Sequence, residues 1–269
     1  MALLPGDAHI GAVTLRVRNL VRSLHFYREV LGFRELARSG PSASLGTAAG
    51  RTLVTLEERP GASSRPRRSA GLFHVAVLVP SRAALGASLR RLIEREWPLS
   101  GVADHLVSEA LYLDDPDGLG LEIYRDRPRD TWQRHGDEVV MATDPLDIEG
   151  LVQEPGADQP WNGLQPRTAI GHVHLQVPHL DAAERFYCEG VGLTPTLRRY
   201  PGALFVSAGG YHHHLGLNTW AGVGVPPPPA DAVGLRQFTI RSRSIVSREE
   251  VDLATGVTVV FAPGDGDRP

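Results

Sequence analysis

The chain has 269 residues, a formal net charge of −3 and 42% hydrophobic residues, so it is long enough to bury one or two cores. The charge argues against a nucleic-acid partner, because phosphate binding needs a basic surface and Arg is here interspersed with Asp and Glu. No apolar run approaches a membrane span, the first residues do not resemble a signal peptide, and a single cysteine, Cys188, excludes an internal disulfide. We therefore expect a cytoplasmic protein.

The first segment begins with a strand pattern. Apolar residues alternate at Val13, Leu15 and Val17, and an amphipathic helix and further strands follow. A stretch rich in Pro, Gly, Ser and Arg over residues 59–69 predicts an exposed loop. Residues 8–59 thus form one module that begins with a strand and a helix.

A second module of the same kind occupies residues 70–127. Its opening strand places Val75, Val77 and Val79 on one face, and Ser81 is suited to cap a helix that runs to Glu96. Two strands between residues 104 and 126 then reverse at the sequence Asp-Asp-Pro-Asp-Gly, whose Pro and Gly favour a tight turn.

The opening phrase of the chain is repeated in its second half. The runs 10–20 and 170–180 share the pattern I-G-x-V-x-L-x-V-x-x-L, and each is followed by Phe-Tyr. A shorter copy within residues 233–263 has almost no room for a helix. We therefore divide the chain into residues 1–130 with two modules, a connector over 131–167, and residues 168–269 with modules at 168–220 and 233–263. In the connector, Asp144 and Pro145 predict the start of a short helix.

Polar residues gather on one face of these strands. His172, His174 and Gln176 alternate with apolar residues and share a face, because side chains two apart on a strand point the same way. In the second module His74 and Glu122 stand within otherwise apolar strands. A carboxylate in such a strand needs a cationic partner or a metal.

The four modules, the repeated opening and the closing D-P-D-G-x-G-L-E-I-Y resemble the vicinal oxygen chelate superfamily. That group includes glyoxalases, drug-resistance proteins and extradiol ring-cleaving dioxygenases, and the nearest resemblance is to the two-domain catechol 2,3-dioxygenase type. The resemblance implies an α+β fold in which four βαβββ modules, the fourth degenerate, form two half-barrels of curled mixed sheet. It also implies a metal site held by a His on the opening strand of one module and by a His and a Glu of its partner.

Matching this ligand set residue by residue leaves both sequential pairs incomplete. The first two modules offer Ala12, His74 and Glu122, and the last two offer His172, Gln237 and Val260. The second and third modules together supply the full set of His74, Glu122 and His172. We therefore expect these two modules to face each other around one metal, with the first and fourth forming a metal-free partner.

The resemblance also implies roles for three further residues. His213 matches the family position of a histidine that donates a proton during ring cleavage, and Tyr112 matches that of a substrate-binding tyrosine. His105 lies close in sequence to the family position of a further histidine, and we expect it to orient the diol. Two histidines and one carboxylate hold iron(II) while leaving positions open, so iron(II) is favoured, with manganese, zinc and nickel as alternatives. The expected partners are a small aromatic diol and O2, with no nucleic acid or membrane. The sequence leaves open whether the chain forms a homo-oligomer.

Each assignment has an alternative. His74 and His172 fit hydrogen-bonded core histidines, Glu122 fits a salt bridge with Arg125 or Arg127, and His174 fits either a residue that orients the metal site or a polar cavity wall. A glyoxalase-like isomerase or lyase would use its metal as a Lewis acid, and usually has a second carboxylate that the region of Glu57 and Glu58 does not place in line. A drug-binding protein of the same fold would hold an aromatic ligand without turnover.

Overall fold

The computed structural model describes residues 2–264, and most of them lie in two large mixed sheets. The seven-stranded sheet has the order β16 (Arg248–Asp252), β17 (Val257–Pro263), β15 (Gly234–Ser242), β1 (His9–Val17), β4 (Thr52–Glu58), β3 (Ser42–Gly46) and β2 (Arg34–Ser39). The eight-stranded sheet has the order β12 (Thr194–Leu197), β13 (Ala203–Ser207), β14 (Leu215–Asn218), β11 (Ala169–Gln176), β5 (Gly71–Leu78), β8 (Gly120–Asp126), β7 (Ser108–Asp114) and β6 (Gly101–Asp104). The α+β architecture of four modules is confirmed.

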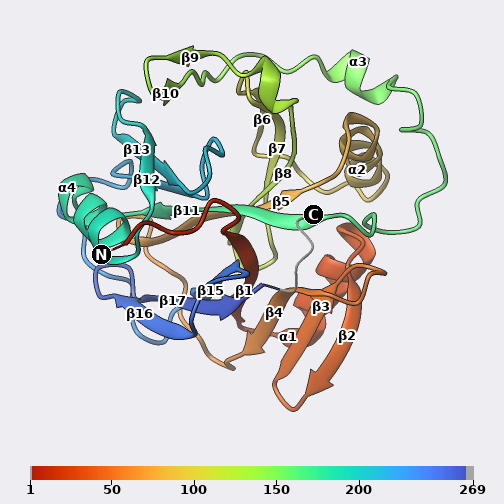
Figure 1. Cartoon of the computed structure of the whole chain (residues 1–269). Helices are drawn as coiled ribbons and strands as arrows, with labels where there is room; N and C mark the ends of the chain where they lie inside the picture. The colour runs from red at the N-terminus through yellow and green to blue at the C-terminus, as the bar shows by residue number, and fades with distance from the viewer. Residues whose placement is uncertain (1, 265–269) are drawn as a thin grey trace.

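The strand order pairs the modules as the ligand matching predicts. β5 of the second module lies antiparallel to β11 of the third, with Val75 opposite Val173 and His74 opposite His174. β1 of the first module pairs with β15 of the fourth. Figure 1 shows the eight-stranded sheet in the upper half of the molecule and the seven-stranded sheet below it, with β11 and β5 crossing the middle.

Short helices follow the opening strands and cover the sheets. They are α1 (Leu20–His25) continued by η1 (Phe26–Val30), α2 (Arg82–Glu94), η2 (Arg129–Thr131), α3 (Ile148–Val152), and α4 (Leu180–Glu184) continued by η3 (Arg185–Gly190). The connector adds the small hairpin of β9 (Arg134–His135) and β10 (Glu138–Val139). The fourth module has strands and no helix among its described residues, in agreement with its shortened sequence.

Helix starts test the capping predictions. α2 begins as predicted, because the side chain of Ser81 accepts a hydrogen bond from the amide of Ala84. The predicted helix start at Asp144 and Pro145 is wrong. The backbone of Asp144 instead forms an antiparallel bridge with Asp104, and α3 starts later, where Asp147 accepts from the amide of Gly150.

Each half of the chain contains a buried hydrogen bond between a tyrosine and an aspartate at corresponding positions of the repeat. The hydroxyl of Tyr27 in the first module donates to Asp115 in the second, and the hydroxyl of Tyr187 in the third module donates to Asp252 in the fourth. Both tyrosines are fully buried, Asp115 directly follows β7, and Asp252 is the last residue of β16, so both acids stand just before the turn that leads to the last strand of their module. These bonds join each opening helix to the module that follows it in sequence, although the sheets pair differently.

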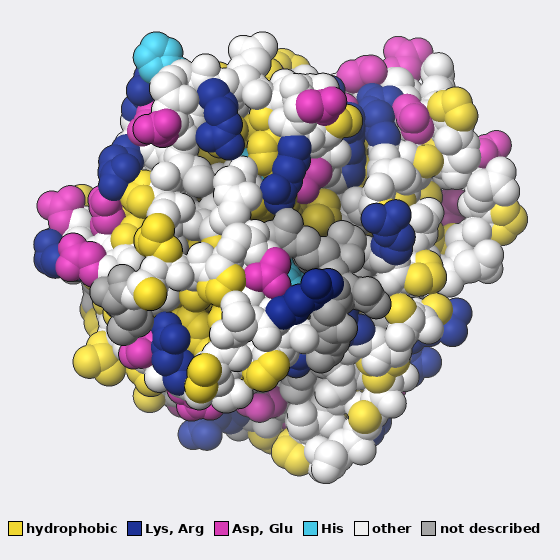
Figure 2. All heavy atoms as spheres, viewed as in Figure 1, with side chains coloured by type: hydrophobic (Ala, Val, Ile, Leu, Met, Phe, Trp, Pro, Cys, Tyr) yellow, Lys and Arg dark blue, Asp and Glu magenta, His cyan; other side chains and the backbone are white. Residues whose placement is uncertain are grey.

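Figure 2 shows acidic and basic side chains interspersed over the face that it draws, without a region of one sign. Among residues 2–264, the helices are all too short or too polar to cross a bilayer.

Asp115→Asn is expected to flatten the pH dependence of stability. Burial raises the pKa of Asp115 from an ordinary value of 3.8 to about 7, so its contribution is fully present below the unfolded pKa and is lost as pH rises through the folded one. Between pH 5 and 7 the natural chain should lose on the order of 1 kcal/mol of unfolding free energy per pH unit from this group. Urea unfolding at several pH values measures it, and equal pH slopes for both proteins would contradict the assignment.

Candidate metal centre

Three central strands of the eight-stranded sheet supply the predicted ligand set. His74 lies on β5, Glu122 on β8 and His172 on β11, and these strands are direct neighbours in the order β11–β5–β8. The opposite faces of β5 and β11 carry Val75 and Val173, which belong to the main hydrophobic core. The apolar alternation therefore fixes the polar residues on the cavity side of the sheet.

The donor atoms of the three side chains converge. Nε2 of His74 and Nε2 of His172 each lie 2.9 Å from Oε2 of Glu122, and the two nitrogens are 3.3 Å apart. Ligands in adjacent positions around a metal, with bonds of about 2.1 Å, lie about 3 Å from each other. All three side chains are buried. The donor set and its spacing therefore fit a divalent cation bound on one face, with the remaining positions open.

The protonation states suit a metal ligand set. Burial lowers the pKa of His172 to about 4, so its imidazole is neutral at neutral pH. Burial alone would raise the pKa of Glu122, but attraction and hydrogen bonds from His172 and His74 outweigh it and hold that pKa well below its usual range. A neutral imidazole and a carboxylate are the forms that bind a metal without first releasing a proton.

A cavity of about 420 Å³ opens on the ligand set, and the three other predicted site residues line it. The Tyr112 hydroxyl lies 2.6 Å from Nε2 of His105, whose Nδ1 lies 2.6 Å from the carbonyl oxygen of Ala142. Since a carbonyl only accepts, His105 donates from Nδ1 to Ala142, and its Nε2 is the ring nitrogen in contact with the Tyr112 hydroxyl. Burial and the nearby Glu122 raise the pKa of Tyr112 well above its usual value, so the hydroxyl keeps its proton.

The three consecutive histidines, His212 to His214, have different surroundings. Residues 211–214 form an irregular turn before β14 rather than a continuous strand, and all three imidazoles are buried. Only His213 lines the cavity, where its ring centroid lies 4.1 Å from that of His172. Burial lowers the pKa of His213 well below its usual value. His212 and His214 make hydrogen bonds with Asp126 and Ser207.

His174 is a cavity wall. Its ring lies 4.9 Å from that of His74 and 5.1 Å from that of Phe73, measured between centroids. Its Nε2 is buried and has no hydrogen-bond partner in the structure, so it does not orient a metal ligand through that atom. Gly216 makes room for it, because a Cβ there would come within 2.8 Å of the imidazole.

Sequence reasoning missed the aromatic walls of the cavity. Phe73, Tyr200, Phe205 and Trp220 line one side, and Phe73 and Trp220 are in edge contact at 5.4 Å between centroids. These residues come from two strands and two loops, so no spacing in the sequence joins them. Strand alternation predicts Phe73 on the face opposite His74, but the pairing of β5 with β11 shifts register beside His74, and Phe73 also lines the cavity.

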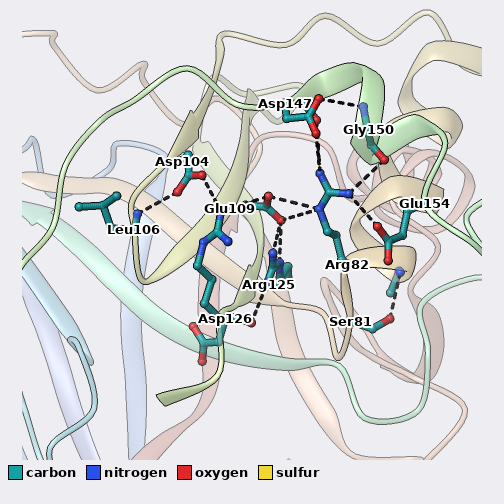
Figure 3. A network of polar contacts seen from close by, with 12 residues as sticks. Ser81, Arg82, Asp104, Leu106, Glu109, Arg125, Asp126, Asp147, Gly150 and Glu154 are labelled. Atoms are coloured by element: carbon teal, nitrogen blue, oxygen red, sulfur yellow. Dashed lines mark hydrogen bonds and ion pairs between the residues drawn. The ribbon is translucent and has the colours of Figure 1, made fainter. Parts of the chain in front are cut away.

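The salt-bridge alternative for Glu122 is wrong. Arg125 and Arg127 instead contact Glu109, which is buried on the other side of the sheet and does not line the cavity. Figure 3 shows Glu109 at the centre of a polar network that also includes Arg82. Arg82 in turn contacts Glu154 beyond α3, so this network ties α2 and the connector to the sheet.

Glu109→Gln is expected to destabilise the protein by about 2 kcal/mol, because it leaves the arginine charges around a 3% exposed position without their shared carboxylate. The expected loss of stability is smaller than for a fully buried ion pair, because Arg82 and Arg127 are partly exposed. Urea unfolding measures the change. Asp147→Asn, at the exposed edge of the same network, serves as the control and should change stability by less than about 0.5 kcal/mol. Equal stability of both variants would contradict the prediction.

The chain is similar to known proteins over most of its length. The family model of the Glyoxalase/Bleomycin resistance protein/Dioxygenase superfamily matches residues 9–123. The catechol-2,3-dioxygenase of Bacillus subtilis (strain 168) is 49% identical over 251 residues, which cover 92% of this chain and 86% of that protein.

Solved structures show the same fold at low sequence identity. A candidate dioxygenase from Bacillus subtilis matches with a TM-score of 0.63 and 15% identity, covering 96% of this chain and 85% of that one. Glyoxalase I from Zea mays matches with a TM-score of 0.56 and 14% identity, covering 94% and 92%. Together with the closely similar relative, these matches show that the chain belongs to the glyoxalase/bleomycin resistance protein/dioxygenase superfamily.

Proposed function

We propose that this protein is an extradiol dioxygenase that opens the ring of a catechol with O2. The single observation that carries the proposal is the buried set of His74, Glu122 and His172, whose donor atoms converge beside a cavity. The 49% identical relative carries the name catechol-2,3-dioxygenase, which is the activity that this ligand set and cavity suit.

The proposed metal is iron(II), held by the three converging side chains. Held there, iron(II) would bind the diol and O2 and would exchange electrons with both. Manganese, zinc and nickel accept the same donor types, so metal analysis is part of the test.

The residues of the chain that face the diol move and hold protons. The Tyr112 hydroxyl and His105 form one hydrogen-bonded pair at the cavity wall, and we assign them to orienting the diol. To His213, whose pKa is lowered by burial and whose ring lies beside that of His172, we assign the role of taking a proton from the diol and returning it later in the reaction. Because these groups are buried, water competes little for their hydrogen bonds.

The cavity walls favour an uncharged ring. The carboxylates that line the cavity are those of Glu122 and Asp114, and its described lining includes no arginine or lysine that could pair with a substrate carboxylate. Aromatic side chains, Phe73 and Trp220 among them, provide flat apolar surfaces for a ring. We therefore expect neutral catechols to bind better than catechols that carry a carboxylate.

The isomerase alternative finds no support at this site. Glu57 and Glu58 lie on β4 of the other sheet, and Glu58 accepts a hydrogen bond from the amide of Leu20. Neither lines the cavity. The cytoplasmic location is proposed from the single cysteine alone, which fits a reducing compartment.

The test is aerobic turnover of catechol by protein loaded with iron(II) under anaerobic conditions. We expect one O2 consumed per ring opened and a yellow aldehyde-acid product, with no product in the absence of O2. The same protein should not convert the adduct of methylglyoxal with glutathione after nickel loading. Tight catechol binding without O2 uptake would instead indicate a binding protein of this fold.

A further inference from the structure

The cavity histidine stands at the end of a row of three side chains. Nδ1 of His213 lies 2.8 Å from Nδ1 of His212, and Nε2 of His212 lies 2.8 Å from Oδ1 of Asp126. His212 is fully buried, whereas Asp126, at the end of β8, is partly exposed (Figure 3). The proposed reaction uses His213, and the other two members have no role in it so far.

The chemistry of these contacts fixes where the protons lie. The carboxylate of Asp126 accepts, so His212 donates from Nε2. In the neutral form of His212 the Nδ1 atom carries a lone pair, and in that form the short contact is made by the N–H at Nδ1 of His213. The Nε2 of His213 is left without a proton, and it is the ring nitrogen free for the cavity.

We propose that Asp126 and His212 are positioning residues that hold His213 in the tautomer able to accept a proton from the substrate. The inference rests on the proposed function. In the step, an O–H bond of the diol breaks and an N–H bond forms at Nε2 of His213. The resulting imidazolium keeps its Nδ1–H bond to His212, which Asp126 orients, and the same proton later passes to an oxygen atom that comes from O2.

A second contact of Asp126 offers a purely structural explanation. Its Oδ1 also accepts from the hydroxyl of Tyr211 at 3.2 Å, and that hydroxyl lies 2.7 Å from the hydroxyl of Tyr124. If Asp126 served only to hold these tyrosines, its loss would affect stability and leave the histidines unchanged. Tyr211→Phe removes both tyrosine hydrogen bonds and leaves the contact of Asp126 with His212, so it separates the two explanations.

Nitrogen NMR of histidine-labelled protein without metal tests the tautomers directly. We expect His212 to carry its proton on Nε2 and His213 on Nδ1, with His212→Asn and His213→Asn used to assign the signals. In Asp126→Asn the amide no longer requires a proton on Nε2 of His212, so both single-tautomer signatures should be lost. Signatures retained in Asp126→Asn would overturn the proposal, and this readout holds whether or not the protein cleaves catechol.

Steady-state kinetics of the iron-loaded protein supply the second readout. Asp126→Asn should lower kcat about ten- to a hundredfold while KM for catechol and the iron content stay the same. Asp126→Glu should recover part of the loss, and Tyr211→Phe should remain within about threefold of the natural protein. An unchanged kcat in Asp126→Asn, or an equal loss in Tyr211→Phe, would overturn the proposal. If no variant and no natural protein cleaves catechol, the proposed function fails and the NMR result still decides the role of Asp126.

Discussion

Glu122→Ala and His172→Ala are each expected to abolish metal binding and ring cleavage together. Each variant removes one of three converging donors, and the other two then cannot close the ligand set. Mutation of a residue that only hydrogen-bonds to a metal ligand commonly lowers metal affinity about ten- to a hundredfold. Removal of a direct ligand should therefore lower iron affinity by more than about a hundredfold. Metal analysis after anaerobic iron(II) loading should fall from about one iron per chain to a trace, and turnover should vanish with it.

A matched control keeps this result specific. His25 is exposed on α1, far along the chain from the cavity residues, and His25→Ala should keep both the iron and the turnover. Circular dichroism of each variant shows whether the sheets remain. If Glu122→Ala loses iron but His172→Ala keeps it, the two residues do not share one ion and the proposed centre is wrong.

His213→Asn is expected to lower kcat by about 10²- to 10⁴-fold while the iron content stays at its natural level. His213 contributes no atom to the converging donor set, yet its ring lies 4.1 Å from that of His172 at the cavity wall. Its loss should therefore affect proton transfer and leave metal binding intact. Saturating kinetics with catechol, beside metal analysis of the same sample, measure the two effects separately.

The control for this variant comes from the same module. His179 is exposed after β11, and His179→Asn should keep kcat within about twofold. A kcat for His213→Asn that matches this control would remove His213 from the reaction. A loss of iron in His213→Asn would show that it belongs to the ligand set.

The fold and the ligand set could be predicted because both follow from the alternation of apolar and polar residues along the strands. Two apolar strand patterns, around Val75 and Val173, predict which residues face the core, and the opposite parity then places His74 and His172 on the cavity side. The non-sequential pairing followed from the incompleteness of each sequential ligand set. In the structure the register pairs His74 with His174 and His172 with Ala76 across β5 and β11, and the imidazoles of His74 and His172 still meet on the cavity side, 3.3 Å apart at Nε2.

The remaining parts of the site depend on tertiary contacts, which the spacing of residues along the sequence does not predict. Trp220 and Tyr200 reach the cavity from loops, whose paths are set by tertiary packing rather than by local sequence. The row from Asp126 through His212 joins residues far apart in the sequence, and the irregular backbone of 211–214 turns the imidazoles in ways that strand alternation does not describe. The helix predicted at Asp144 failed for the same reason, since a backbone bridge to Asp104 outweighs a local capping preference.

The order of the strands in the sheets also has a consequence for synthesis on the ribosome. β1 is the first strand to leave the ribosome, but β15, which pairs with one of its edges, comprises residues 234–242 and is synthesised near the end of the chain. An N-terminal half that emerges early therefore cannot complete its own sheet and keeps an apolar strand edge unpaired until the chain is nearly finished. We expect folding to be slow and largely post-translational, because closure of each sheet joins segments from opposite halves of the chain.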